Sequence, residues 1–139
     1  MPPLSRWYIK AALIYFVVAL LAGVLRAAEP LVALPRVIAA IGPAQVHLLV
    51  VGWITQMIFG VAYWMFPKYA PERPRGNDVV AVATFVLLNA GLLLRVAVEP
   101  RHTLDPTPTL GGLLVLSAAA QWLAGVGFVA NTWSRIKVK

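Results

Sequence analysis

The stretch HLLVVGWITQMIFGVAYWMFPK, from His47 to Lys68, decides the fold, because its apolar part is as long as a membrane is thick. An α-helix needs about 20 mostly apolar residues to cross the hydrocarbon of a bilayer. The chain has 139 residues, of which 60% are hydrophobic and 12% charged, too apolar for a soluble domain of this size to bury. We therefore predict an all-α integral membrane four-helix bundle, a single domain over residues 1–139 with helices at about 8–28, 46–66, 79–98 and 110–132.

The basic residues are divided unevenly between the two ends of these predicted helices. Eight of the twelve flank the end that carries both termini and the loop 67–78, namely Arg6, Lys10, Lys68, Arg73, Arg75, Arg135, Lys137 and Lys139. The other four are Arg26, Arg36, Arg95 and Arg101. Because basic loops stay on the cytoplasmic side, we predict cytoplasmic N- and C-termini in a prokaryotic plasma (inner) membrane. The scattered positive charge favours contact with anionic lipid over nucleic acid.

The two halves of the chain share short sequence similarities. The segment AGVLRAAEP (residues 22–30) resembles AGLLLRVAVEP (90–100), and QMIFGVAY (56–63) resembles QWLAGVGF (121–128). These pairs suggest a tandem helical-hairpin repeat about an axis along the membrane normal, the alternative being chance similarity between apolar helices. In such a repeat Gly112 takes the position of His47.

Three polar side chains, Gln56, Asn89 and Gln121, fall near the predicted middle of the bilayer. Small neighbours at helical spacing let helix backbones approach, so these amides can bond across helices. We expect them to join helices, with a substrate or proton path as the alternative reading.

Three ionisable residues, Arg26, His47 and Arg95, fall at one depth, about 6–7 Å inside the predicted helix ends. Such residues are costly in a membrane and usually face a partner or a cavity. Histidine ligates haem iron and arginine pairs with carboxylates such as the haem propionates, so the three favour a haem b site. The alternatives are arginines that extend to the headgroups and a histidine that bonds a neighbouring helix.

The predicted second helix has two distinct faces. At about 100° per residue, His47 shares its face with the apolar residues Val51, Ile54, Ile58 and Met65, which suit a porphyrin edge or lipid. The face expected to pack against other helices contains Gly52, Gln56, Gly60 and Tyr63.

The same helix resembles a known motif, H-x-x-x-x-G-W-x-x-x-x-x-x-G-x-x-Y-x-x-x-P. The matching residues are His47, Gly52, Trp53, Gly60, Tyr63 and Pro67. The motif is that of subunit-I-like proteins: the catalytic subunits of cbb-type haem–copper oxidases and nitric oxide reductases, and small four-helix proteins similar to them. The resemblance implies that His47 is an axial ligand of haem b, as in a cytochrome b. With only two histidines the chain lacks the second metal site of the large subunits, so we expect no independent catalytic activity.

The sixth haem position has three candidates: His102, the His47 of a second copy in a homodimer or other homo-oligomer, or an open site that binds gas. The leading hypothesis is therefore electron transport, or gas or haem binding, near the outer membrane face. The alternative is a haem-free structural or assembly subunit that binds a respiratory-chain protein. A transporter is a third option, although the apparent lack of an acid within the spans argues against proton coupling. The absence of cysteine excludes disulfides, iron–sulfur clusters and c-type haem attachment.

Overall fold

The computed structural model describes residues 1–68 and 75–136, so Arg73, Lys137 and Lys139 lie outside the described residues. Every regular element within those ranges is helical. The elements are α1 (Pro3–Ala28), α2 (Arg36–Ala39), α3 (Gly42–His47), the π-helix η1 (Leu48–Thr55), α4 (Gln56–Met65), α5 (Asp78–Leu104) and α6 (Pro108–Trp133).

Four helical stretches are long and apolar enough to cross a membrane: Pro3–Ala28, Gly42–Met65, Asp78–Leu104 and Pro108–Trp133. The prediction of an all-helical chain with four candidate spans is confirmed, although each helix extends beyond the range expected for it at one end at least. The second span is one continuous run of α3, η1 and α4.

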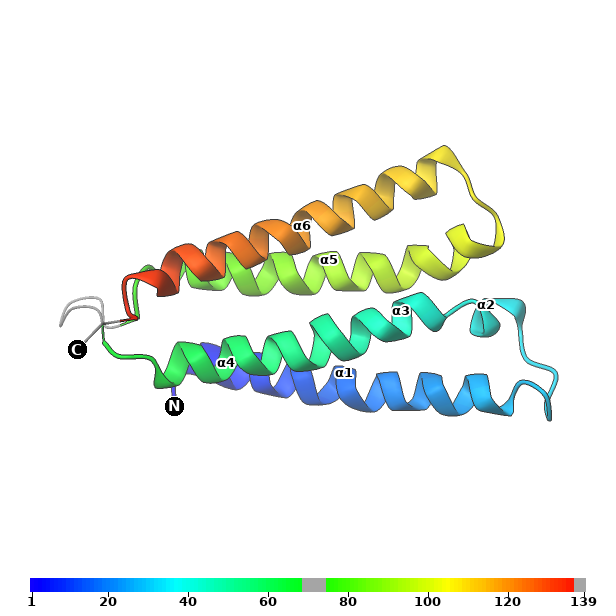
Figure 1. The fold of residues 1–139 in the computed structure, drawn as a ribbon, viewed down its shortest axis with the longest axis horizontal. Helices are drawn as coiled ribbons and strands as arrows, with labels where there is room; N and C mark the ends of the chain where they lie inside the picture. The colour runs from blue at the N-terminus through cyan, green and yellow to red at the C-terminus, as the bar shows by residue number, and fades with distance from the viewer. Residues whose placement is uncertain (69–74, 137–139) are drawn as a thin grey trace.

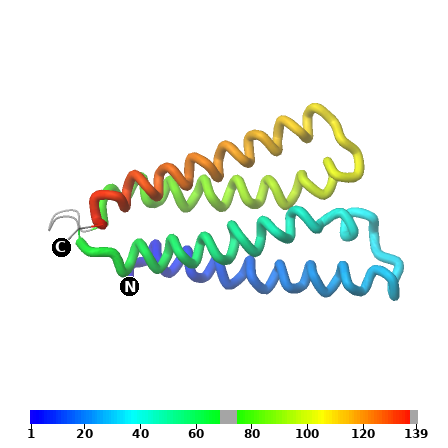
Figure 2. Tube along the Cα trace, viewed as in Figure 1, coloured from blue at the N-terminus to red at the C-terminus, as the bar shows by residue number. Residues whose placement is uncertain are grey.

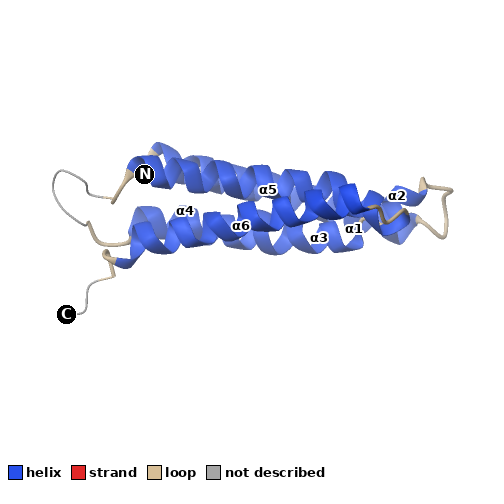
Figure 3. Ribbon diagram, turned by 90° about the horizontal axis from the view of Figure 1, so that it is seen from above, coloured by secondary structure: helices blue, strands red, loops and turns tan. Residues whose placement is uncertain are grey.

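The spans form two helical hairpins that lie side by side (Figure 1). In one hairpin α1 packs against η1 and α4, and in the other α5 packs against α6. Contacts of α5 with α3 and η1 join the two hairpins. The Cα trace and the view from above show the start of α1 and the end of α6 at the same end of the bundle (Figures 2 and 3).

Polar caps and prolines set where several helices begin. The Asn77 side chain accepts hydrogen bonds from the backbone N–H groups of Val79 and Val80, at 2.9 and 3.3 Å, which starts α5. The Thr107 hydroxyl accepts one from Leu110 N at 3.3 Å, which starts α6. Proline occupies the first turn of α1, α3 and α6, where its missing N–H has no helical partner to lose.

α5 passes through Pro100 to Leu104, beyond the end near residue 98 that the sequence predicted. A proline inside a helix removes one backbone hydrogen bond, but membrane helices tolerate it where side chains and neighbours satisfy the freed groups. In this turn the Thr103 hydroxyl donates to the Glu99 carbonyl oxygen at 2.8 Å, while the carbonyl that loses its N–H donor to Pro100 is that of Val96. The continuation places Glu99 and His102 in a helix, where a loop was expected.

A buried amide pair joins the two hairpins near the middle of the bundle. Gln56, which is 0% exposed, donates to Asn89 Oδ1 at 3.1 Å and accepts from Asn89 Nδ2 at 3.2 Å. The Tyr15 hydroxyl also donates to Asn89 Oδ1, at 2.9 Å. Gln121 instead donates to Ser117 of its own helix at 3.1 Å, and Ser117 donates to the Gly91 carbonyl of α5 at 2.7 Å. The expected bonding of these midplane amides is present, directly for Gln56 and Asn89 and through Ser117 for Gln121.

The second span packs on α1 through its glycines. A Cβ added at Gly52 would lie 2.9 Å from Tyr15 Cβ, and one at Gly60 would lie 2.8 Å from Tyr8 Cβ. Gly52, Gln56, Gly60 and Tyr63 are all buried, which confirms the predicted packing face.

Arg135 fastens the end of the bundle that carries the termini. Its side chain is 0% exposed. Its guanidinium donates to the carbonyl oxygens of Tyr63, Phe66 and Pro67, at 3.1, 2.8 and 3.0 Å, just where α4 ends. Burial lowers the pKa of Arg135, yet arginine remains charged in proteins, and a cation suits a helix C-terminus.

Candidate functional site

A cluster of His47, Glu99 and Arg95 forms at the opposite end from the termini, where α3 meets α5. We call these three residues the His47 cluster. His47 is the last residue of α3, and its side chain is 29% exposed. Its Nδ1 lies 3.0 Å from the carbonyl oxygen of Pro43, one turn earlier, and 3.6 Å from Glu99 Oε2. The ring is therefore hydrogen-bonded to its own helix and faces the Glu99 carboxylate of α5.

Glu99 connects the histidine to the arginine. Its Oε1 accepts from Arg95 Nε at 3.2 Å and from Arg95 Nη2 at 3.1 Å. Its Oε2 is buried and, in the part of the chain that the structure describes, lacks a hydrogen-bond partner. Glu99 as a whole is 9% exposed. The prediction that the spans contain no acid is therefore wrong, because Glu99 lies inside α5.

The charges within this cluster offset each other. An isolated carboxylate or guanidinium in a membrane is costly, whereas a hydrogen-bonded pair costs much less. The Arg95–Glu99 pair is spaced i, i+4 on one helix and forms without distortion of the backbone. A neutral His47 then leaves the cluster without net charge.

Arg26 belongs to a different contact from the one predicted. Its Nη1 donates to Gln45 Oε1 at 3.0 Å, and Gln45 Nε2 donates to the Ala19 carbonyl oxygen at 3.1 Å. The Arg26 side chain remains exposed, with its guanidinium against Gly42. The structure thus brings His47 and Arg95 together through Glu99, while Arg26 lies where α1 meets α3.

His102 lies in the last turn of α5, beyond the range of about 79–98 that the sequence predicted for this helix. The nearest atom to a Cβ built at Gly111 is His102 Cε1, at 3.7 Å, so the imidazole lies over the start of α6. Its Nδ1 is buried and finds no partner within residues 1–68 and 75–136. Over the same residues, no group of three or more His, Cys, Asp or Glu side chains is placed to hold a metal ion.

The π-helix η1 begins directly after His47 and changes which residues share its face. The Thr55 hydroxyl bonds the Val50 carbonyl five residues earlier, at 2.8 Å. Ile54 is 45% exposed, as the predicted apolar wall requires, but Val51 is half-buried and packs against the core. The projection at a constant helical angle therefore places Gly52, Gln56, Gly60 and Tyr63 correctly and misplaces Val51. Wide helical turns of this kind occur frequently at functional sites.

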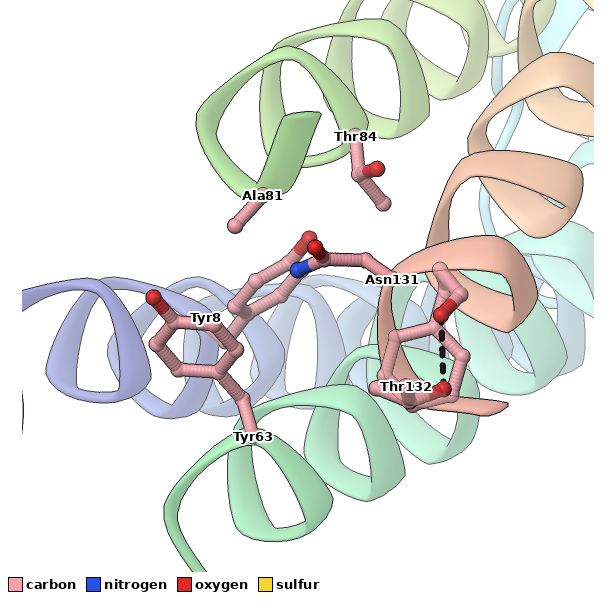
Figure 4. A pocket seen from close by; sticks show the side chains of 7 residues that line it. Tyr8, Tyr63, Ala81, Thr84, Asn131 and Thr132 are labelled. Atoms are coloured by element: carbon pink, nitrogen blue, oxygen red, sulfur yellow. Dashed lines mark hydrogen bonds between the residues drawn. The ribbon is translucent and has the colours of Figure 1, made fainter. Parts of the chain in front are cut away.

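A small interior hollow lies between all four spans, near the end that carries the termini. It measures about 10 Å³, about the space of one water. Figure 4 shows the rings of Tyr8 and Tyr63 on one side, Ala81 and Thr84 above them, and Asn131 and Thr132 opposite. This hollow is too small for a porphyrin, and it lies at the other end of the bundle from His47.

These features define a four-helix membrane protein with a histidine, a carboxylate and an arginine clustered at one end of the bundle. Comparison of the chain with protein-family models, curated proteins and solved structures gave no match. The function is therefore inferred from the residues of the chain and their geometry.

Proposed function

We propose that the protein binds haem b, with Nε2 of His47 as an axial ligand. The supporting observation is the 3.0 Å contact between His47 Nδ1 and the Pro43 carbonyl oxygen. A carbonyl accepts a hydrogen bond, so Nδ1 holds the proton of the neutral imidazole, and Nε2 retains its lone pair. Metal-ligating histidines commonly have this arrangement, in which the second nitrogen donates to a carbonyl or carboxylate.

The surroundings of His47 are compatible with a haem on the surface of the bundle. The imidazole is partly exposed, and Ile54 offers apolar surface on the same span. Arg26 is exposed and suits a propionate, whereas Arg95 uses two of its N–H groups on Glu99. Bound haem supplies reversible one-electron chemistry at iron, and the protein supplies the ligand, the apolar contact and the charge.

The remaining features of the proposal follow from the sequence. The distribution of basic residues supports cytoplasmic termini, which puts His47 near the outer face of a prokaryotic plasma membrane. The sixth iron position would be filled by His102, by His47 of a second copy, or by a gas. We favour the second copy, since two-fold dimers are the commonest oligomers and the His47 side chain is partly exposed at the surface of the bundle. We also propose that the two helical hairpins are a tandem repeat.

An absorption spectrum of the purified protein in mild detergent tests the haem. The oxidised and dithionite-reduced states are recorded for the wild type, for His47→Ala and for His102→Ala. A Soret band with sharp reduced α and β bands that disappears only in His47→Ala supports a six-coordinate haem on His47. Loss of the sharp bands in both variants identifies His102 as the sixth ligand. A wild type that stays colourless after haem is added excludes the proposal.

A haem-free structural or assembly subunit is the second candidate, and the exposure of α6 favours it. Only 11% of the apolar window of α6 is buried, compared with 28% in each of the other spans. A shallow apolar hollow follows its exposed side, lined by Trp122, Gly125, Val126, Val129, Ala130 and Trp133. Lipid or a respiratory-chain protein would cover this surface. A colourless protein that assembles into a larger respiratory complex through α6 would support this candidate.

A further inference from the structure

We propose that Glu99 is the positioning residue of His47. Its carboxylate keeps the imidazole proton on Nδ1, so that Nε2 presents a lone pair for binding. That iron binds Nε2 rests on the proposed function, whereas the location of the imidazole proton on Nδ1 is independent of it. Glu99 therefore acts through His47, even before any cofactor binds.

The first argument is the chemistry around Nδ1. Its two polar neighbours are the Pro43 carbonyl at 3.0 Å and Glu99 Oε2 at 3.6 Å. Both are acceptors, since a carbonyl and an ionised carboxylate have no proton to donate. A neutral imidazole with its proton on Nε2 would direct a lone pair at two oxygen atoms. The environment therefore favours the Nδ1–H tautomer.

The second argument is the unused oxygen of Glu99. Arg95 donates two N–H groups to Oε1 and so fixes the carboxylate, while Oε2 is buried without a hydrogen-bond partner among the described residues. A buried acceptor left without a donor costs about 1–3 kcal/mol. The His47 Nδ1–H faces this oxygen from 3.6 Å, just beyond hydrogen-bond distance.

The third argument is that Glu99 and Pro43 restrain the ring from different elements. Pro43 belongs to the same short helix as His47, so its carbonyl follows any motion of α3. Glu99 belongs to α5 in the other hairpin. A contact to both fixes the ring relative to the bundle, which is how outer partners orient metal-binding histidines.

Nitrogen NMR of the haem-free protein tests the tautomer directly. The protein is labelled with ¹⁵N-histidine in a His102→Gln background, so that His47 gives the only imidazole signals. We expect the Nδ1–H tautomer to dominate. Glu99→Gln, which keeps the shape and removes the charge, should lower the ratio of Nδ1–H to Nε2–H by about three- to tenfold, the equivalent of one hydrogen bond. The matched control is Asp105→Asn, which removes a carboxylate six residues further along the chain and should leave the ratio unchanged.

A dominant Nε2–H form in the wild type, or a ratio that Glu99→Gln leaves unchanged, overturns the proposal. If Glu99→Gln does not fold, the wild type still decides the question through solid-state NMR. A ¹⁵Nδ1–¹³Cδ dipolar coupling between His47 and Glu99 supports the proposal, and its absence refutes it.

The haem is examined separately, so that the two proposals can fail independently. In the holoprotein, loss of the Glu99 charge should shift the midpoint potential to more positive values, because a carboxylate near the axial ligand favours ferric iron. A midpoint potential that Glu99→Gln leaves unchanged would also contradict the proposed role of Glu99. A colourless wild type would refute the haem proposal and leave the tautomer result valid. A coloured wild type whose tautomer ratio is unchanged by Glu99→Gln would refute only the proposed role of Glu99.

Discussion

The amide pair of Gln56 and Asn89 gives the most direct test of how the two hairpins are held together. Alanine at either position removes two reciprocal hydrogen bonds, of 3.1 and 3.2 Å. Alanine at Asn89 also removes the bond from the Tyr15 hydroxyl, of 2.9 Å. Asn89→Ala leaves the buried Gln56 amide without these partners in a region where water is scarce, whereas Gln56→Ala leaves Asn89 bonded to Tyr15 and to the Phe85 carbonyl oxygen.

The expected magnitude follows from these bonds. Interhelical hydrogen bonds in membrane proteins contribute about 0.6 kcal/mol each on average. Asn89→Ala, which removes three, should lower the free energy of unfolding by about 1.8 kcal/mol, and Gln56→Ala, which removes two, by about 1.2 kcal/mol. The double variant should lower the free energy of unfolding by less than the sum of the two single variants, because both single variants remove the same two reciprocal bonds. The difference, a coupling energy, should be about 1.2 kcal/mol.

A double-mutant cycle measures this coupling, with unfolding followed in mixed detergent micelles. The control cycle pairs Gln56→Ala with Gln121→Ala, since no hydrogen bond joins these two side chains in the described residues. The control should be additive within about 0.5 kcal/mol. A Gln56–Asn89 coupling below about 0.3 kcal/mol would show that the pair does not join the hairpins, and the reasoning would be refuted.

Three further predictions concern packing, the end of the bundle and orientation. Gly60→Ala should lower the free energy of unfolding by about 1–3 kcal/mol, because the added Cβ would lie 2.8 Å from Tyr8 Cβ. Gly112→Ala, whose Cβ would have no described atom within 4 Å, should change it by less than about 0.5 kcal/mol. Equal effects of the two substitutions would contradict the packing of the second span on α1. Arg135→Ala should cost about 2–4 kcal/mol in the same assay, and Arg135→Lys should recover less than half, because lysine cannot reach three carbonyls at once. Reporter fusions should place the C-terminus in the cytoplasm and the loop between α1 and α2 outside, and the reverse result would exclude the proposed orientation.

The sequence was sufficient to predict the number of spans and the packing face of the second one. Hydropathy and length identify the spans, since the membrane sets both. The small and polar residues Gly52, Gln56 and Gly60 recur at helical spacing, which is why their burial could be predicted. These features depend on local sequence alone.

The His47 cluster was only partly predictable. Pro100 suggested a helix end, so Glu99 was read as a loop residue, although its spacing of four residues from Arg95 is the signal that a helix continues there. The π-helix had no signal that we could identify, because Leu48–Thr55 is an apolar run that fits either kind of helix. Within this segment Val51 packs against the core and Ile54 is exposed.

The π-helix also sets the angular phase between the two halves of the second span. A turn with hydrogen bonds five residues apart holds one residue more than an α-helical turn, much as an inserted residue would. Removal of one residue from Leu48–Thr55 would let the segment return to α-helical winding with His47 and Gln56 nearly in their present phase, because the wide turn already accommodates the extra residue. Insertion of a further α-helical residue would instead rotate His47 by roughly a quarter turn relative to Gln56 and move the imidazole away from Glu99. Chain length within this apolar stretch therefore determines the direction in which the histidine points.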